Sequence, residues 1–276
     1  MSENCGDKKR IGKGLVTVIL AFVAFYAVGM AYKLIAFPYI QPRLSFWLEW
    51  CIRYAVLYGI GLPLFIGISK KEPAVHLEKP GKLDVGKFLK YAVIALGLTT
   101  VGGMLQGLIL SLMTKTPVAE MPNYFKGGTV LEALLFLCIV PPFLEEMFFR
   151  RILLGKLEAY GERVALFGSA LAFAVYHTLL TSFQILHVFL LGILLAYVCL
   201  RTRRILYSML IHAIVNLWSV WSGFVVPALP EPFSMFAPAL ILPVMIGFIV
   251  ILIKNRKRMI GIITGKIRIT ESGKAL

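Results

Sequence analysis

Apolar residues dominate eight long stretches of the chain, and short polar stretches separate them. A helix that crosses a bilayer needs about 20 mostly apolar residues, and each stretch approaches or exceeds this length. The stretches cover residues 14–36, 44–69, 86–114, 128–149, 164–182, 184–200, 204–226 and 235–253. The pattern therefore predicts an all-α fold, a polytopic bundle of about eight transmembrane helices. Nothing in the pattern resembles a separate soluble domain, so residues 1–276 are interpreted as one integral-membrane domain.

The composition agrees with a membrane protein. Hydrophobic residues make up 59% of the 276 positions, and the mean hydropathy is +0.82, whereas a soluble domain is closer to half apolar. The basic N-terminus followed by an apolar run could also be a cleavable signal peptide. We interpret it as a retained first helix, because the run is long enough to span and no clean A-x-A cleavage site follows it.

The distribution of positive charge predicts the topology. Cytoplasmic loops of membrane proteins collect Lys and Arg. If the N-terminus is cytoplasmic, 24 of the 29 Lys and Arg residues fall on the inner side. The outer side keeps only Lys33, Arg43, Arg53, Lys115 and Lys126. We therefore expect both termini in the cytoplasm. The net charge of +15 does not indicate nucleic-acid binding, because no basic run is set in a soluble domain.

The fourth apolar stretch ends in an unusual group of charges, in the sequence "PPFLEEMFFR" at residues 141–150. Glu145, Glu146 and Arg150 could mark a helix end that meets water. However, the chain continues as "MFFRRILLGKL", which favours a helix that runs past Arg150 and draws both glutamates below the surface. Neighbouring positions on a helix differ by about 100°, so Glu146 and Arg150 share one face and Glu145 points elsewhere.

Two other stretches carry polar residues among apolar ones. His177 lies in "ALAFAVYHTLLTS", and His212 and Asn216 lie at i,i+4 spacing in "SMLIHAIVNLWSV". Each alone could be a polar contact between helices. Together with the glutamates they have the groups needed to activate water and to stabilise an oxyanion. The same side chains could bind a divalent metal such as zinc, with Glu145, His177 and His212 as ligands.

The other polar residues of the apolar stretches are interpreted as structural: Gln106, Glu132, His187 and the pair Glu49 with Arg53. Competing hydrolase signatures are missing. The chain has no H-E-x-x-H helix and no G-x-S-x-G elbow. The only aspartates, Asp7 and Asp84, lie outside the apolar stretches, which excludes an intramembrane aspartate pair. The four cysteines form no CxxC pair, so neither a disulfide framework nor a zinc–thiolate site is expected.

Three short motifs resemble those of a known family. "EEMFFR", "FAVYH" and "HAIVN" are similar to E-E-x-x-x-R, F-x-x-x-H and H-x-x-x-N/D, the motifs of the CPBP family. This family contains the CAAX proteases and bacteriocin-processing enzymes and is also called Abi. The motif-bearing region covers about residues 128–226, and no motif position departs from the pattern.

The resemblance implies an intramembrane glutamate-dependent endopeptidase with a cavity open to the cytoplasm. By motif position, Glu145 would be the general base for water and His177 would help to orient it. His212 and Asn216 would stabilise the oxyanion, while Glu146 with Arg150 would hold the geometry. The substrate class would be a peptide or lipidated protein at the membrane. The resemblance leaves the need for a metal open.

A non-catalytic protein is the alternative, either an immunity or scaffold protein or a small transporter that uses these polar groups as a relay. One catalytic site requires Glu145, His177 and His212 at a common depth. At about 1.5 Å per residue, the segment edges put them at different depths. We therefore expect that the fourth helix continues past Arg150 and that the fifth segment starts deeper than its apparent edge.

Overall fold

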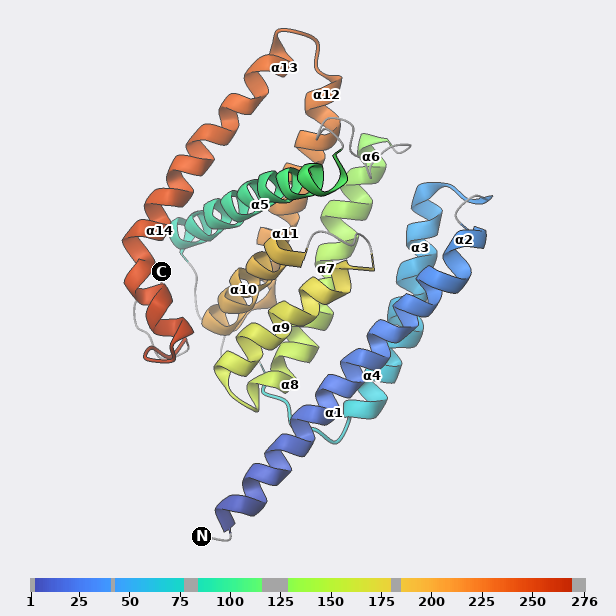
Figure 1. The fold of residues 1–276 in the computed structure, drawn as a ribbon, viewed down its shortest axis with the longest axis vertical. Helices are drawn as coiled ribbons and strands as arrows, with labels where there is room; N and C mark the ends of the chain where they lie inside the picture. The colour runs from blue at the N-terminus through green and yellow to red at the C-terminus, as the bar shows by residue number, and fades with distance from the viewer. Residues whose placement is uncertain (1–2, 41–42, 77–83, 116–128, 180–184, 270–276) are drawn as a thin grey trace.

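A computed structural model of the protein describes residues 3–40, 43–76, 84–115, 129–179 and 185–269. Within these residues all eight predicted segments are helical and no strand occurs (Figure 1). The α-helices are α1 (Glu3–Ala31), α2 (Phe37–Ile40), α3 (Phe46–Val56), α4 (Leu62–Ser69), α5 (Val85–Thr114), α6 (Val130–Ala133), α7 (Val140–Glu146), α8 (Leu154–Glu158), α9 (Glu162–His177), α10 (Ile185–Thr202), α11 (Ile205–Val220), α12 (Val226–Ala228), α13 (Phe233–Phe236) and α14 (Ile241–Ile263). Short π-helical or 3₁₀ turns join the pieces that belong to one segment.

Five of the described helical stretches are long and apolar enough to cross a membrane, judged by length and composition. They are Ile11–Ile40, Trp47–Ser69, Val85–Met113, Ile185–Thr202 and Phe233–Ile263. The chain is therefore an integral membrane protein with several apolar helices. The number of eight crossings and the cytoplasmic location of both termini stay predictions.

The fourth segment is one continuous helical stretch over residues 130–158 that carries the two glutamates, and we call it the fourth rod. It begins with a capping box in which Thr129 and Glu132 satisfy each other's backbone N–H groups. This is the structural role expected of Glu132. The rod then passes through π-helical turns on either side of α7 and ends at Glu158. Figure 1 shows α6, α7 and α8 descending through the molecule between the end near α12 and the end near α4. The predicted continuation past Arg150 is confirmed.

The expectation for the fifth segment is wrong. Its helix α9 begins at Glu162, two residues before the predicted edge at 164, and ends at His177. Glu145 lies 13 residues before the end of α8, and His177 lies 15 residues after the start of α9. At about 1.5 Å per residue these distances are about 20 Å and 22 Å. The length of the fourth rod alone therefore brings the two side chains to one level. The stretch "LTSFQ" at 180–184 lies outside the described residues.

Aromatic side chains fill the space around the fourth rod. Phe148 stacks on Phe25 of α1 with ring centroids 4.3 Å apart, and Phe149 meets Phe173 of α9 edge to face at 5.2 Å. All four rings are fully buried. Because lipid is as apolar as these side chains, tight packing rather than exclusion of water holds such helices together. The packing fixes the rotation of the rod on which Glu145 lies.

Candidate functional site

Five of the six predicted site residues meet inside the helix bundle. The fourth rod contributes both glutamates and the arginine, α9 contributes one histidine, and α11 contributes the other. Both glutamates and the arginine are buried, with exposed fractions of 1% or less. The five residues are Glu145, Glu146, Arg150, His177 and His212. Three sequence motifs that are far apart along the chain therefore form one cluster.

Glu145 lies at the centre of this cluster. Its Oε2 atom is 3.9 Å from Nε2 of His177 and 3.9 Å from Nε2 of His212. Its other oxygen, Oε1, accepts a long hydrogen bond of 3.4 Å from the hydroxyl of Tyr54 on α3. Oε2 makes no well-aligned hydrogen bond with another described residue. One carboxylate oxygen is thus held by the protein, and the other faces two imidazoles across gaps too long for direct hydrogen bonds.

The partners of the two Nδ1 atoms assign the tautomers of the histidines. Nδ1 of His177 is 2.8 Å from the carbonyl oxygen of Phe173, one turn earlier on α9. Nδ1 of His212 is 3.1 Å from Oε1 of Glu146. A carbonyl and a carboxylate oxygen only accept, so each Nδ1 carries the proton that it donates. Both Nε2 atoms are then the free reactive nitrogens, and both face Glu145.

Glu146 and Arg150 form a buried ion pair beside this centre, as their i,i+4 spacing predicts. Nε of Arg150 is 3.1 Å from Oε2 of Glu146, and both side chains are 0% exposed. Arg150 also donates from Nη1 to Oγ of Ser169 at 2.9 Å, and its guanidinium lies 4.7 Å above the ring of Phe173. Ser169 in turn donates to the carbonyl of Phe149. These contacts hold Glu146 in place under His212.

The charges of the cluster balance when one proton is shared. Arg150 neutralises Glu146, which leaves Glu145 with no fixed counter-charge in the cluster. An unpaired charge is costly in a buried site. One further proton in the cluster would restore neutrality. Glu145 is therefore the carboxylate of the cluster that no arginine neutralises there.

Asn216 is the predicted site residue that lies apart from this cluster. Its amide nitrogen Nδ2 donates to the backbone carbonyl of Leu137 at 2.6 Å. Leu137 belongs to the π-helical turn just before α7. The structure therefore joins Asn216 to the fourth rod through the backbone, and not through the glutamates.

Tyr54 and Ser169 are contacts of the site that sequence reasoning missed. Tyr54 is buried, 6% exposed, and its hydroxyl donates to Glu145. Ser169 is fully buried and holds Arg150. A tyrosine and a serine are ordinary in apolar helices, and neither belongs to the three motifs. A weak signal existed for Ser169, which lies two turns before His177 on the same helix.

The predicted metal ligands do not have the spacing of a metal site. Zinc binds histidine nitrogen at about 2.0–2.1 Å, which brings tetrahedral ligands within about 3.4 Å of one another. Here both Nε2 atoms are 3.9 Å from Oε2 of Glu145. Across the described residues no three His, Cys, Asp or Glu side chains are grouped so that they could hold a metal ion. We therefore route no step of the chemistry through a metal.

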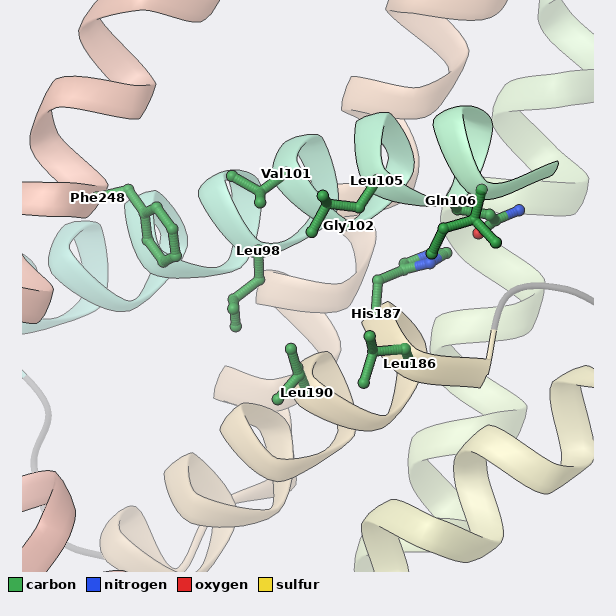
Figure 2. Close-up of a pocket in the computed structure, with 10 residues that line it drawn as sticks. Leu98, Val101, Gly102, Leu105, Gln106, Leu186, His187, Leu190 and Phe248 are labelled. Carbon is green, nitrogen blue, oxygen red and sulfur yellow. The ribbon is translucent and has the colours of Figure 1, made fainter. Parts of the chain in front are cut away.

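The polar residues interpreted as structural have contacts outside the cluster around Glu145. Glu49 and Arg53 pair with each other at 2.9 Å on α3. His187 and Gln106 line an apolar cleft of about 260 Å³ between α5, α10 and α14, and Figure 2 shows both side chains in the space between α5 and α10. Gly102 of α5 packs directly on the side chain of His187, where a Cβ atom would collide with it. This contact explains His187 as a residue at a close helix crossing.

Comparison with known proteins adds one finding. Residues 127–218 match a family described as type II CAAX prenyl endopeptidase Rce1-like. The CPBP resemblance is confirmed. The match covers a third of the chain and includes all three motifs, from Glu145 to Asn216. The matched region thus contains the fourth rod, α9, α10 and most of α11. Neither a curated protein nor a solved structure matches the chain.

Proposed function

We propose that this protein is an intramembrane glutamate-dependent endopeptidase. It hydrolyses a peptide bond in a membrane-associated or lipid-tethered substrate. The observation that carries the proposal is the position of Glu145, whose Oε2 lies 3.9 Å from two histidine Nε2 atoms in a buried site. The family match to CAAX prenyl endopeptidases supports the same class of reaction.

Glu145 acts as the general base. A hydrogen bond to water is about 2.8 Å long, so one water oxygen can contact both Oε2 of Glu145 and Nε2 of His177 across the 3.9 Å gap. Glu145 takes a proton from this water while the water oxygen bonds to the carbonyl carbon of the substrate. His177 accepts a hydrogen bond from the water and aims its lone pair. Tyr54 holds the opposite carboxylate oxygen and so fixes the direction of Oε2.

His212 stabilises the negative oxygen that develops on the substrate carbonyl. Its protonated Nε2 faces the same space as Oε2 of Glu145, and Glu146 accepts from its Nδ1. A preorganised charged donor in a buried site is the most effective kind of transition-state stabilisation. Collapse of the intermediate breaks the C–N bond, and Glu145 passes its proton to the leaving amine. Glu146 and Arg150 keep their charges throughout.

The location of the site supports this substrate class. The reactive atoms lie about 20 Å along the helices from the α8–α9 turn, between membrane-embedded elements. A soluble chain would have to leave water to reach them, whereas a lipid-tethered peptide is already held at the membrane. We place the opening of the site toward the cytoplasm, on the side where the positively charged loops are predicted.

A cleavage assay in oxygen-18 water tests this proposal. The purified protein in liposomes is given a farnesylated peptide with a free C-terminus, and the products are weighed by mass spectrometry. We expect one heavy oxygen in the new carboxylate of the product, no product with Glu145→Ala, and slower cleavage of the same peptide without its lipid. A well-folded protein that cleaves neither peptide would favour the non-catalytic alternative. Cleavage by Glu145→Ala at the normal rate would overturn the mechanism.

A further inference from the structure

A pair of prolines lies inside the fourth rod, one turn before the proposed general base. Pro141 and Pro142 are the second and third residues of α7, and Glu145 follows four residues after the first of them. Both prolines are buried. Proline has no N–H group and cannot donate to the helix ladder. The prolines therefore leave part of the preceding turn without its normal donors.

Only one carbonyl of that turn loses its donor in both helical registers. In an α-helix the carbonyl of residue i accepts from residue i+4, and in a π-helix it accepts from residue i+5. For Leu137 these two positions are Pro141 and Pro142. The carbonyls of Phe136 and Cys138 each keep one residue with an N–H group, at position 140 or 143. The turn Leu134–Ile139 is π-helical, so both registers meet at this point.

Asn216 supplies the missing donor. Its Nδ2 is 2.6 Å from the carbonyl oxygen of Leu137, and a carbonyl cannot donate, so the amide group must present its N–H side. The contact joins α11 to the fourth rod on the N-terminal side of the prolines. Four residues earlier on α11, His212 contacts Glu146 on the C-terminal side of the prolines. The two contacts thus clamp the proline-containing turn from both ends, and Glu145 lies between them.

We propose that Asn216 is a positioning residue that acts through the backbone of Leu137. It replaces the donor that Pro141 and Pro142 remove, and it thereby fixes where α7 begins and where Glu145 points. This role of Asn216 deepens the proposed function and rests on it. It differs from the oxyanion contact implied by the family resemblance. Misplacement of a catalytic group by about 1 Å can cost about a hundredfold in rate, so such a clamp has a kinetic effect.

The test uses proline replacement as a rescue. Asn216→Ala leaves the Leu137 carbonyl without a donor, and we expect kcat for the farnesylated peptide to fall about 10-fold to 100-fold with KM unchanged. Pro141→Ala restores an N–H group four residues after Leu137. We therefore expect the double variant Asn216→Ala with Pro141→Ala to recover most of kcat, and Pro141→Ala alone to stay near the wild-type rate. An oxyanion donor could not be replaced in this way.

Two matched controls separate this effect from general changes in helix stability. Asn255→Ala removes an amide contact of the same 2.6 Å length, to Ile251 on α14, and we expect an unchanged kcat. Pro63→Ala adds an N–H group at the start of α4, and we expect it not to rescue Asn216→Ala. Rescue by Pro63→Ala as strong as by Pro141→Ala would contradict the proposal, as would failure of Pro141→Ala to rescue at all.

The proposal can also be tested if Asn216→Ala accumulates poorly. In that case the amount of folded protein replaces kcat, and recovery by Pro141→Ala supports the clamp whereas no recovery overturns it. A Glu145→Ala arm in the same assay keeps the two proposals apart. An active Glu145→Ala protein would sink the proposed function, and the rescue would then be judged from accumulation alone.

Discussion

Two Glu–Arg pairs with the same i,i+4 spacing lie within the described helices. Glu49 and Arg53 are on α3, with nitrogen and oxygen 2.9 Å apart, and Glu146 and Arg150 are on the fourth rod, 3.1 Å apart. Both carboxylates are almost completely buried, with side-chain exposures of 2% and 0%. The sequence pattern is therefore the same in both places, and the two carboxylates are buried to nearly the same extent.

The neighbours of the two pairs differ. Arg53 donates from two nitrogens to both oxygens of Glu49, and Tyr32 donates to the same carboxylate at 3.0 Å. Both oxygens of Glu49 are therefore held by donors from Arg53 and Tyr32. In the fourth rod a second glutamate, Glu145, precedes the pair, and its Oε2 makes no well-aligned hydrogen bond among the described residues.

The difference shows how a buried charge pair becomes part of a reactive site. An ion pair alone stabilises little once desolvation is counted, and the Glu49 pair contributes helix packing. In Glu146, by contrast, one oxygen pairs with Arg150 and the other accepts from His212. That leaves a neighbouring carboxylate and two imidazole nitrogens facing one another without direct bonds. The region around Glu145 therefore differs from the Glu49–Arg53 pair in having acceptor atoms without direct hydrogen bonds, and not in being charged.

The largest effect on rate that extends this comparison is expected at His212. His212→Ala removes both the donor near Glu145 and the partner of Glu146. General acid–base groups contribute about 10²–10⁴-fold, and we expect a loss of peptide cleavage of about 10³-fold. His187→Ala, in the apolar cleft on α10, is the control and should cleave at the normal rate. Equal rates for the two variants would contradict the assigned role.

Replacement of Arg150 tests how strongly the Glu146–Arg150 pair depends on both partners. Removing one partner of a buried ion pair costs about 3–5 kcal/mol, so Arg150→Ala should lower the thermal stability of the purified protein and its accumulation. Arg53→Ala should cost less, because Arg53 is 13% exposed whereas Arg150 is 0% exposed. Thermal unfolding in detergent measures both. A larger loss with Arg53→Ala would reverse the ranking.

The two tyrosines that donate to the glutamates give a smaller, more selective contrast. Tyr54→Phe removes the donor to Glu145, and a net hydrogen bond of about 1 kcal/mol corresponds to about a fivefold loss of kcat. Tyr32→Phe removes the donor to Glu49 and should change stability by about 1 kcal/mol with no change in kcat. If the two replacements slow cleavage equally, Tyr54 does not orient the base.

Chelation should have the smallest effect. The spacing of Glu145 and the two histidines does not suit a metal ion. We therefore expect cleavage in EDTA to proceed at the untreated rate. Loss of activity in EDTA that added zinc restores would show that a metal takes part and would require a different role for Glu145.

Much of the fold follows from the hydropathy pattern. Apolar length alone located the eight helical segments in order, because a spanning helix has a minimum length. The i,i+4 spacing also predicted the contact between Glu146 and Arg150, which is local to one helix. The depth of the site was harder, because it depends on where the fourth rod ends. Arg150 and Arg151 look like a helix end in sequence, yet the rod continues to Glu158.

Contacts between distant helices could not be predicted from one sequence. Tyr54 reaches Glu145 across 91 positions, and Ser169 holds Arg150 from another helix. Nothing in the sequence marks Tyr54 as such a partner, and the only signal for Ser169 is its position two turns before His177. The proline pair was a signal that went unused. Two adjacent prolines inside a helix leave a carbonyl without a donor, and Asn216 provides one.

The central claim is that Glu145, and not merely any buried glutamate, activates water. Glu145→Gln keeps the shape of the side chain but removes its capacity to accept a proton. Glu49→Gln makes the same change in the Glu49–Arg53 pair. With both proteins at equal amounts in liposomes, the initial rate of farnesylated-peptide cleavage is the deciding measurement. The account predicts a loss of about 10³-fold for Glu145→Gln and a near-normal rate for Glu49→Gln. A Glu145→Gln protein that cleaves as fast as the wild type would contradict it.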